Sequence, residues 1–141
     1  MKLLPTELPG VVLIETPQFA DDRGWFMESF NVARWQEGLQ VLGLPRPRPF
    51  VQDNHSCSQA GVLRGLHYQL PPHAQGKLVR VVKGAAFDVA VDIRRTSPTF
   101  GQWVGMELSA ANRRQLWVPE GFAHGFIALE DMQLLSLKLA S

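Results

Sequence analysis

Cysteine is almost absent from this 141-residue chain, in which Cys57 is the single example. One cysteine excludes an internal disulfide and is typical of a protein from a reducing compartment. Because Cys57 has no sequence-adjacent partner, we expect a buried or partly buried thiol rather than a nucleophile.

An excess of charge of one sign is also missing, since 14 basic residues face 13 acidic ones and the net charge is +1. This balance lacks the basic footprint of a nucleic-acid-binding protein. The N-terminus has no long apolar run, so we expect neither a signal peptide nor a membrane span. The sequence therefore predicts a cytoplasmic protein that forms one domain over residues 1–141.

Short segments rich in β-branched and aromatic residues fill most of the chain, and turns separate them at regular intervals. Nine or so such segments predict an antiparallel sandwich or a small barrel. One peripheral helix is expected, with Asn31 as its N-cap and Gly43 in a left-handed C-terminal cap. Its apolar positions recur at helical spacing: Val32, Trp35, Leu39 and Leu42.

Two of the expected strands carry acidic side chains among apolar ones. In the segment from Trp25 to Phe30, Glu28 shares a face with Phe26. In the segment from 85 to 93, Asp88 lies on the face opposite the larger apolar residues, so it faces either water or a barrel lumen.

The segment from Gly61 to Lys77 gathers an arginine, two histidines and a lysine. Arg64 and His67 belong to one expected strand, Lys77 opens the next, and the Pro71-Pro72 pair forces a loop between them. A base and a cation on adjacent strands can act together on one carbonyl group, and the two cations also suit an anionic ligand such as a phosphate. The structural alternative is a hydrogen-bonded histidine beside surface charges.

Two patterns in this all-β context resemble the motifs of the cupin jelly roll. The first has Gly61 and His67, but it has Gln69 where a second histidine belongs. The second consists of Pro119, Gly121 and His124. Two histidines beside Lys77 make a poor ligand set, so we expect no bound metal.

A more specific resemblance covers nearly the whole chain, in seven ordered blocks. These blocks are similar to the dTDP-4-dehydrorhamnose 3,5-epimerase family. They are residues 22–30, 50–56, 61–69, 72–77, 87–92, 97–101 and 116–126.

The resemblance implies an antiparallel cupin-type jelly roll that forms a homodimer and needs no cofactor. It also implies epimerisation of dTDP-4-dehydro-6-deoxyglucose at C3 and C5, in dTDP-L-rhamnose biosynthesis. His67 matches the family's base and Lys77 the residue that stabilises the oxyanion, while Asp88 would orient neighbouring groups. The positions that match substrate-binding residues are Arg23, Phe26, Glu28, Gln52, Asp53, Asn54, Arg64, Lys77 and His124.

The family pattern is interrupted near the end of the chain. The family's proton donor is a tyrosine in a Tyr-Lys pair, and here Leu137 precedes Lys138 at that place. The acid that pairs with the base histidine lies in a C-terminal extension beyond the position of Ser141. Three classes therefore stay open: an epimerase with altered chemistry, a catalytically impaired binder of nucleotide sugars, and a sugar-nucleotide ketoisomerase.

Overall fold

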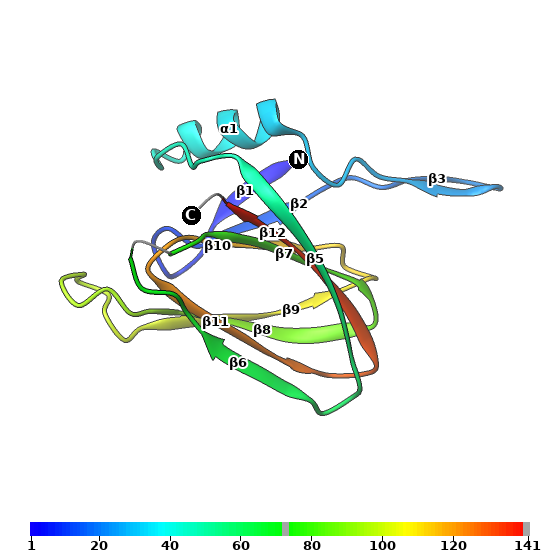
Figure 1. Ribbon diagram of the computed structural model, residues 1–141. Coiled ribbons are helices and arrows are strands. Elements are labelled where there is room, and N and C mark those ends of the chain that lie inside the picture. Colours follow the sequence, from blue (N-terminus) through cyan, green and yellow to red (C-terminus); the bar gives the residue numbers. More distant parts are fainter. Residues whose placement is uncertain (72–73, 140–141) are drawn as a thin grey trace.

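The computed structural model describes residues 1–71 and 74–139, and these form two facing antiparallel sheets with one short helix (Figure 1). The all-β architecture predicted from the sequence is confirmed. In the described part of the chain, no helix is long and apolar enough to cross a membrane. Of the expected Pro71-Pro72 loop, Pro71 lies in a turn and Pro72 falls outside the described residues.

The larger sheet has six strands in the order β1-β2-β10-β7-β12-β5. Their bounds are Lys2–Pro5, Val12–Glu15, Gln115–Val118, Lys77–Lys83, Met132–Leu139 and Phe50–Ser58, in that order. The smaller sheet has four strands in the order β6-β11-β8-β9. These span Leu63–His67, Phe122–Ala128, Ala85–Asp92 and Trp103–Ser109.

The space between the two sheets holds the main core. Each strand sends alternate side chains into this interior, because successive residues of a strand point to opposite faces. The buried apolar members come from both sheets and include Val79, Val81, Leu116, Leu134, Phe122 and Phe126. Facing sheets pack about 10 Å apart, so a gap in this filling is wide enough for a sugar ring.

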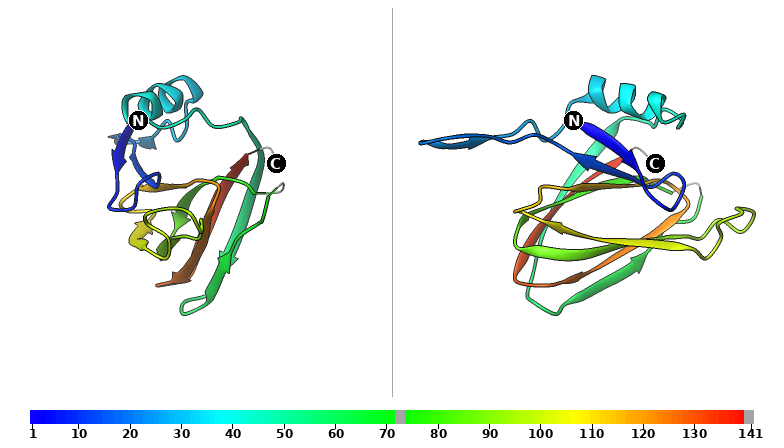
Figure 2. Two further views of the ribbon diagram at one scale, coloured as in Figure 1. Left: turned by 90° about the vertical axis from the view of Figure 1, so that its left-hand side faces the viewer. Right: turned by 180° about the vertical axis from the view of Figure 1, so that it is seen from behind.

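A second core covers the outer face of the six-stranded sheet, where helix α1 (Val32–Val41) lies (Figures 1 and 2). The predicted caps are confirmed: the Asn31 side chain accepts a hydrogen bond from the Arg34 amide, and Gly43 has φ +72°. Trp35 and Leu39 are buried, whereas Val32 is exposed. The helix therefore seals one face of the sheet whose other face lines the interior.

Strands β3 (Phe19–Asp21) and β4 (Gly24–Phe26) form a two-stranded hairpin that projects from the sandwich (Figure 1). The expectation of a strand from Trp25 to Phe30 is wrong beyond Phe26, because the chain leaves the hairpin there and runs to the helix. The expectation of a buried Cys57 is also wrong, since the thiol is exposed on β5, an edge strand of its sheet.

Strand β8 is oriented with its acidic residues inward. Asp88 and Asp92 are fully buried, while Phe87 and Val89 on the opposite face are partly exposed. Of the two orientations open to Asp88, the structure therefore shows the one toward the lumen. Each buried carboxylate has a polar partner, which offsets the cost of removing it from water.

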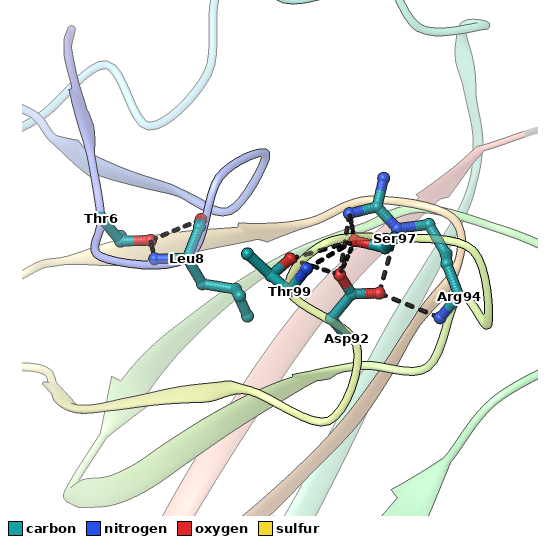
Figure 3. Close-up of polar contacts among 6 residues, drawn as sticks. All are labelled: Thr6, Leu8, Asp92, Arg94, Ser97 and Thr99. Atoms are coloured by element: carbon teal, nitrogen blue, oxygen red, sulfur yellow. Dashed lines mark hydrogen bonds and ion pairs between the residues drawn. The ribbon is translucent and has the colours of Figure 1, made fainter.

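Asp92 is the centre of a hydrogen-bond network that fixes the turn between β8 and β9 (Figure 3). Arg94 donates to it from its backbone amide at 2.9 Å and from Nε and Nη2 at 3.0 Å each. The Ser97 and Thr99 hydroxyls donate to the Oδ2 atom at 2.5 Å. The hydrogen bonds from Arg94 above all hold the pKa of Asp92 far below its ordinary value of 3.8.

Replacing Asp92 with asparagine is expected to lower the free energy of unfolding by about 2–4 kcal/mol at neutral pH, because a buried charged partner is lost. Since the folded-state pKa is depressed, the contribution is complete above the unfolded value of 3.8 and is lost as the pH falls below it. Urea unfolding of both proteins at pH 7 and pH 3 measures this. A difference that does not shrink at pH 3 would contradict the assignment.

Candidate active site

An irregularity in β6 turns two functional side chains toward the interior. Residue His67 pairs with His124 and Arg64 with Phe126, so three steps along β6 match two steps along β11. Such bulges re-aim side chains beside active sites. Gly65 permits it, because a Cβ there would lie 2.7 Å from the Cα of Gly125.

The opposite wall of the interior carries two lysines side by side. Lys77 on β7 pairs directly with Lys138 on β12, and Lys138 pairs on its other side with Gln52 on β5. Directly opposed residues share a face, with Cβ atoms about 5 Å apart. This face is the inner one, since Val79 of the same strand parity belongs to the main core.

A cavity of about 430 Å³ joins these two walls. His67 and Tyr68 line it from the end of β6, and Lys77 and Lys138 line it from the six-stranded sheet. The remaining lining residues are Gln69, Ala74, Gln75, Gly121 and Phe122. The structure thus brings together the predicted base and cation, on opposite sheets.

The ammonium group of Lys77 is held in an unfavourable environment. Burial lowers the pKa of Lys77 below its ordinary 10.5, the positive charge of Lys138 lowers it further, and Asp88 acts in the opposite direction. None of the ion pairs among the described residues involves either lysine. Two like charges in one row cost stability unless an anion binds or forms beside them.

His124 and Asp88 form a buried pair in the four-stranded sheet. The Nε2 atom of His124 lies 2.7 Å from Oδ1 of Asp88, and both side chains are almost completely buried. The second carboxylate oxygen of Asp88 has no hydrogen-bond partner among the described residues. Because His124 is the strand neighbour of His67, this pair fixes the wall on which His67 stands.

Arg64 also points into the interior, where its Nε atom donates to the Ser58 hydroxyl at 2.8 Å. Gln52 and Asn54 lie on the inner side of β5, joined by a hydrogen bond of 3.1 Å. Gln52 and Asn54 therefore continue the wall that Lys77 and Lys138 form, whereas Arg64 belongs to the wall of His67.

Four other residues predicted for the site lie away from the cavity in the structure. Asp53 alternates with Gln52 and Asn54, so it faces outward into a separate small hollow with Arg80. Arg23 and Phe26 lie on the projecting hairpin, and Glu28 follows it, 3.8 Å from Nε of Arg34. None of these four residues lines the cavity. Five other predicted residues face the interior but also lie outside the cavity lining: Arg64, Gln52, Asn54, His124 and Asp88.

Position 137 is on the wrong face for the role that the resemblance gives it. Leu137 packs outward against the second core, together with Leu78. Its neighbour Lys138 faces the cavity instead. Lys138 and Tyr68 line the cavity but were not predicted from the sequence. The alternation of β12, with Leu134 buried inside, places Lys138 on the inner face.

A second hollow of about 500 Å³ lies between the 44–48 segment and the turn after β10. Its arginines include Arg48 and Arg94, which pair with Glu120 and Asp92. None of the described residues that line it is a histidine or a lysine. The cavity between the sheets is therefore the better candidate for chemistry.

Metal binding finds little support in the geometry. Within residues 1–71 and 74–139, no three His, Cys, Asp or Glu side chains cluster as a metal site would require. Gln69 and Lys77 line the cavity where further ligands would be needed. The metal-free site remains a prediction.

The two sheets, with a base on one and cations on the other, define a cupin-type jelly roll suited to proton transfer beside a carbonyl group. A family model for dTDP-4-dehydrorhamnose 3,5-epimerase matches residues 5–141. The chain belongs to this family of isomerases.

Individual relatives agree with the family match. The dTDP-4-dehydrorhamnose 3,5-epimerase of Shigella flexneri is 61% identical over 131 residues, which are 93% of this chain and 70% of the relative. The Legionella pneumophila epimerase, solved in complex with dTDP-4-keto-L-rhamnose, is 48% identical and superposes with a TM-score of 0.90. The match covers 99% of this chain and 72% of the Legionella chain. The Bacillus anthracis enzyme, with TDP and pyrophosphate bound, is also 48% identical, with a TM-score of 0.84. The match covers 97% of this chain and 75% of the Bacillus chain. The cupin-type fold predicted from the sequence is thereby confirmed.

Proposed function

We propose that this protein epimerises dTDP-4-dehydro-6-deoxyglucose at C3 and C5, as a step of dTDP-L-rhamnose synthesis. The observation that supports it most directly is the placement of His67 and Lys77 on opposite walls of one cavity. The C4 ketone acidifies the protons on both neighbouring carbons. A base on one wall can remove such a proton while a cation on the other holds the negative charge that develops on the ketone oxygen.

In this proposal His67 is the base and Lys77 binds the enolate oxygen. Arg64 and the pair of Gln52 and Asn54 offer hydrogen-bond donors along the rest of the interior. His124 and Asp88 hold the four-stranded sheet beside His67. The exposed Cys57 fits a reducing compartment, so we place the reaction in the cytoplasm.

Incubation of the protein with the 4-keto sugar nucleotide in D₂O, followed by proton NMR, tests this function. Loss of the C3 and C5 proton signals reports abstraction, and new coupling constants report inversion. Binding without exchange would favour the nucleotide-sugar binder. Conversion into a 3-keto sugar would favour the ketoisomerase.

The projecting hairpin supports a homodimer with composite sites. Phe19, Trp25 and Phe26 are 64%, 65% and 70% exposed, and none of them lines the cavity. The hairpin that carries them projects from the sandwich (Figure 1). An exposed aromatic cluster of this kind is typical of an interaction site. We propose that the hairpin reaches the cavity of a second copy, where Arg23 and Phe26 bind the nucleotide. Glu28, which follows the hairpin, would assist them.

Composite sites predict complementation between two inactive variants. His67→Asn damages the cavity and Phe26→Ala damages the hairpin, so a heterodimer keeps one intact site in two. After random exchange of subunits, half of the dimers are mixed, and about one quarter of the normal epimerase activity should return. Mixing either variant with itself is the control. No recovery, in mixtures shown to exchange subunits, would place each hairpin at its own cavity.

A further inference from the structure

The cavity contains a second cation whose function the proposed reaction leaves open. Inversion of a carbon requires a proton donor on the face opposite the base. His67 stands on β6 of the four-stranded sheet, and Lys138 stands on β12 of the six-stranded sheet. Both line the same cavity, so a sugar ring between the sheets would have one on each side.

Among residues 1–71 and 74–139, few other groups in the cavity can supply a proton from that side. Tyr68 follows His67 directly and therefore belongs to the same wall as the base. Gln69 and Gln75 carry amide groups that do not act as acids. On the six-stranded sheet, the described side chains that line the cavity and can donate a proton are the ammonium groups of Lys77 and Lys138.

The pairing of the two lysines allows each to interact with a different atom of the substrate. Their strands hold them directly opposite each other on one face, so both ammonium groups reach the same end of the cavity. One can hold the enolate oxygen while the other approaches a neighbouring carbon. Hydrogen bonds fix the end of β12 here, since Leu139 donates to the Gly76 carbonyl at 3.1 Å and Gln75 donates to the Leu139 carbonyl at 3.0 Å.

We propose that Lys138 is the proton donor of the inversion, an inference that rests on the proposed epimerase function. His67 takes the proton from C3 or C5 and becomes imidazolium, leaving an enolate whose oxygen faces Lys77. An N–H bond of the Lys138 ammonium then breaks as a C–H bond forms on the opposite face of that carbon. The neutral amine regains a proton from solvent and the imidazolium loses one, so no oxidant or reductant is needed.

The substitution Lys138→Arg separates the effect of proton donation from the effect of the positive charge. A guanidinium keeps the positive charge but is not deprotonated in proteins, so it cannot act as an acid. Lys138→Arg is therefore expected to exchange substrate protons in D₂O at a rate within a few-fold of the unmodified protein. Its inversion should fall by about 10²-fold or more, the typical value of general acid catalysis.

Two further variants complete the test. Lys138→Met should lose inversion as the arginine variant does, and Tyr68→Phe tests the phenol as an alternative donor. If Lys138→Arg still inverts the sugar at the normal rate, Lys138 acts through its charge and the inference is wrong. Loss of inversion in Tyr68→Phe, with Lys138→Arg active, would make the phenol the donor. Absence of exchange in the unmodified protein would instead overturn the epimerase function itself.

Discussion

Replacing His67 with asparagine is expected to stop exchange of the C3 and C5 protons, with a fall of about 10²–10⁴-fold, the usual contribution of a general base. Asparagine keeps a polar side chain of similar size but cannot accept a proton at neutral pH. Exchange and inversion should fall together, because abstraction precedes both. Proton NMR in D₂O measures the two rates in the same sample.

Affinity for dTDP provides the control for this variant. The nucleotide contacts proposed above involve the hairpin and not His67, so titration should give a nearly unchanged dissociation constant. Exchange that continues at the normal rate would show that another group is the base. The buried His124, paired with Asp88, would then be the next residue to replace.

Replacing Lys77 with methionine is expected to reduce exchange by about 10²–10³-fold, the effect of removing one oxyanion-stabilising group. Methionine preserves much of the side-chain length and removes the charge. Lys138 remains in this variant, so the result also shows whether the two lysines are interchangeable. Loss of inversion with normal exchange would mean that Lys77 is the donor and Lys138 the oxyanion group.

The pH dependence of exchange follows from the environment of Lys77. Its protonated form is the active one, so exchange should be lost as the pH rises through its pKa. Burial and the charge of Lys138 lower that pKa, against the opposing effect of Asp88, so the loss begins below 10.5. Lys138→Met removes one of the lowering charges and should move this alkaline loss of exchange to higher pH.

The local sequence was sufficient for the elements whose signals are local. Asn31 and Gly43 cap the helix as predicted, because each cap depends on a few neighbouring residues. His67 and Lys77 were also predicted to act together, since one short connection joins their strands. The family resemblance supplied the jelly roll.

Features that depend on long-range pairing could not be found in this way. The orientation of β8 could not be predicted from its own sequence. Asp88 can be buried because it pairs with His124, which lies 36 residues away in the chain. Asp53 and Leu137 matched family positions in sequence, yet they are paired with each other on the outer face of the sheet. The partners of β5, β7 and β12 determine which face is internal, and those partners lie far apart along the chain.

The register of β12 determines which of two neighbouring side chains enters the cavity. Lys138 faces the cavity and Leu137 faces the second core, and the alternation of a strand allows no intermediate arrangement. Displacing the strand by one residue would put a hydrocarbon where the amine stands and would turn the Lys138 charge toward the second core. A protein altered in this way would lose stability together with the residue that we propose decides the handedness of its product. Stability and the stereochemistry of the sugar product should therefore be measured together on variants of this strand.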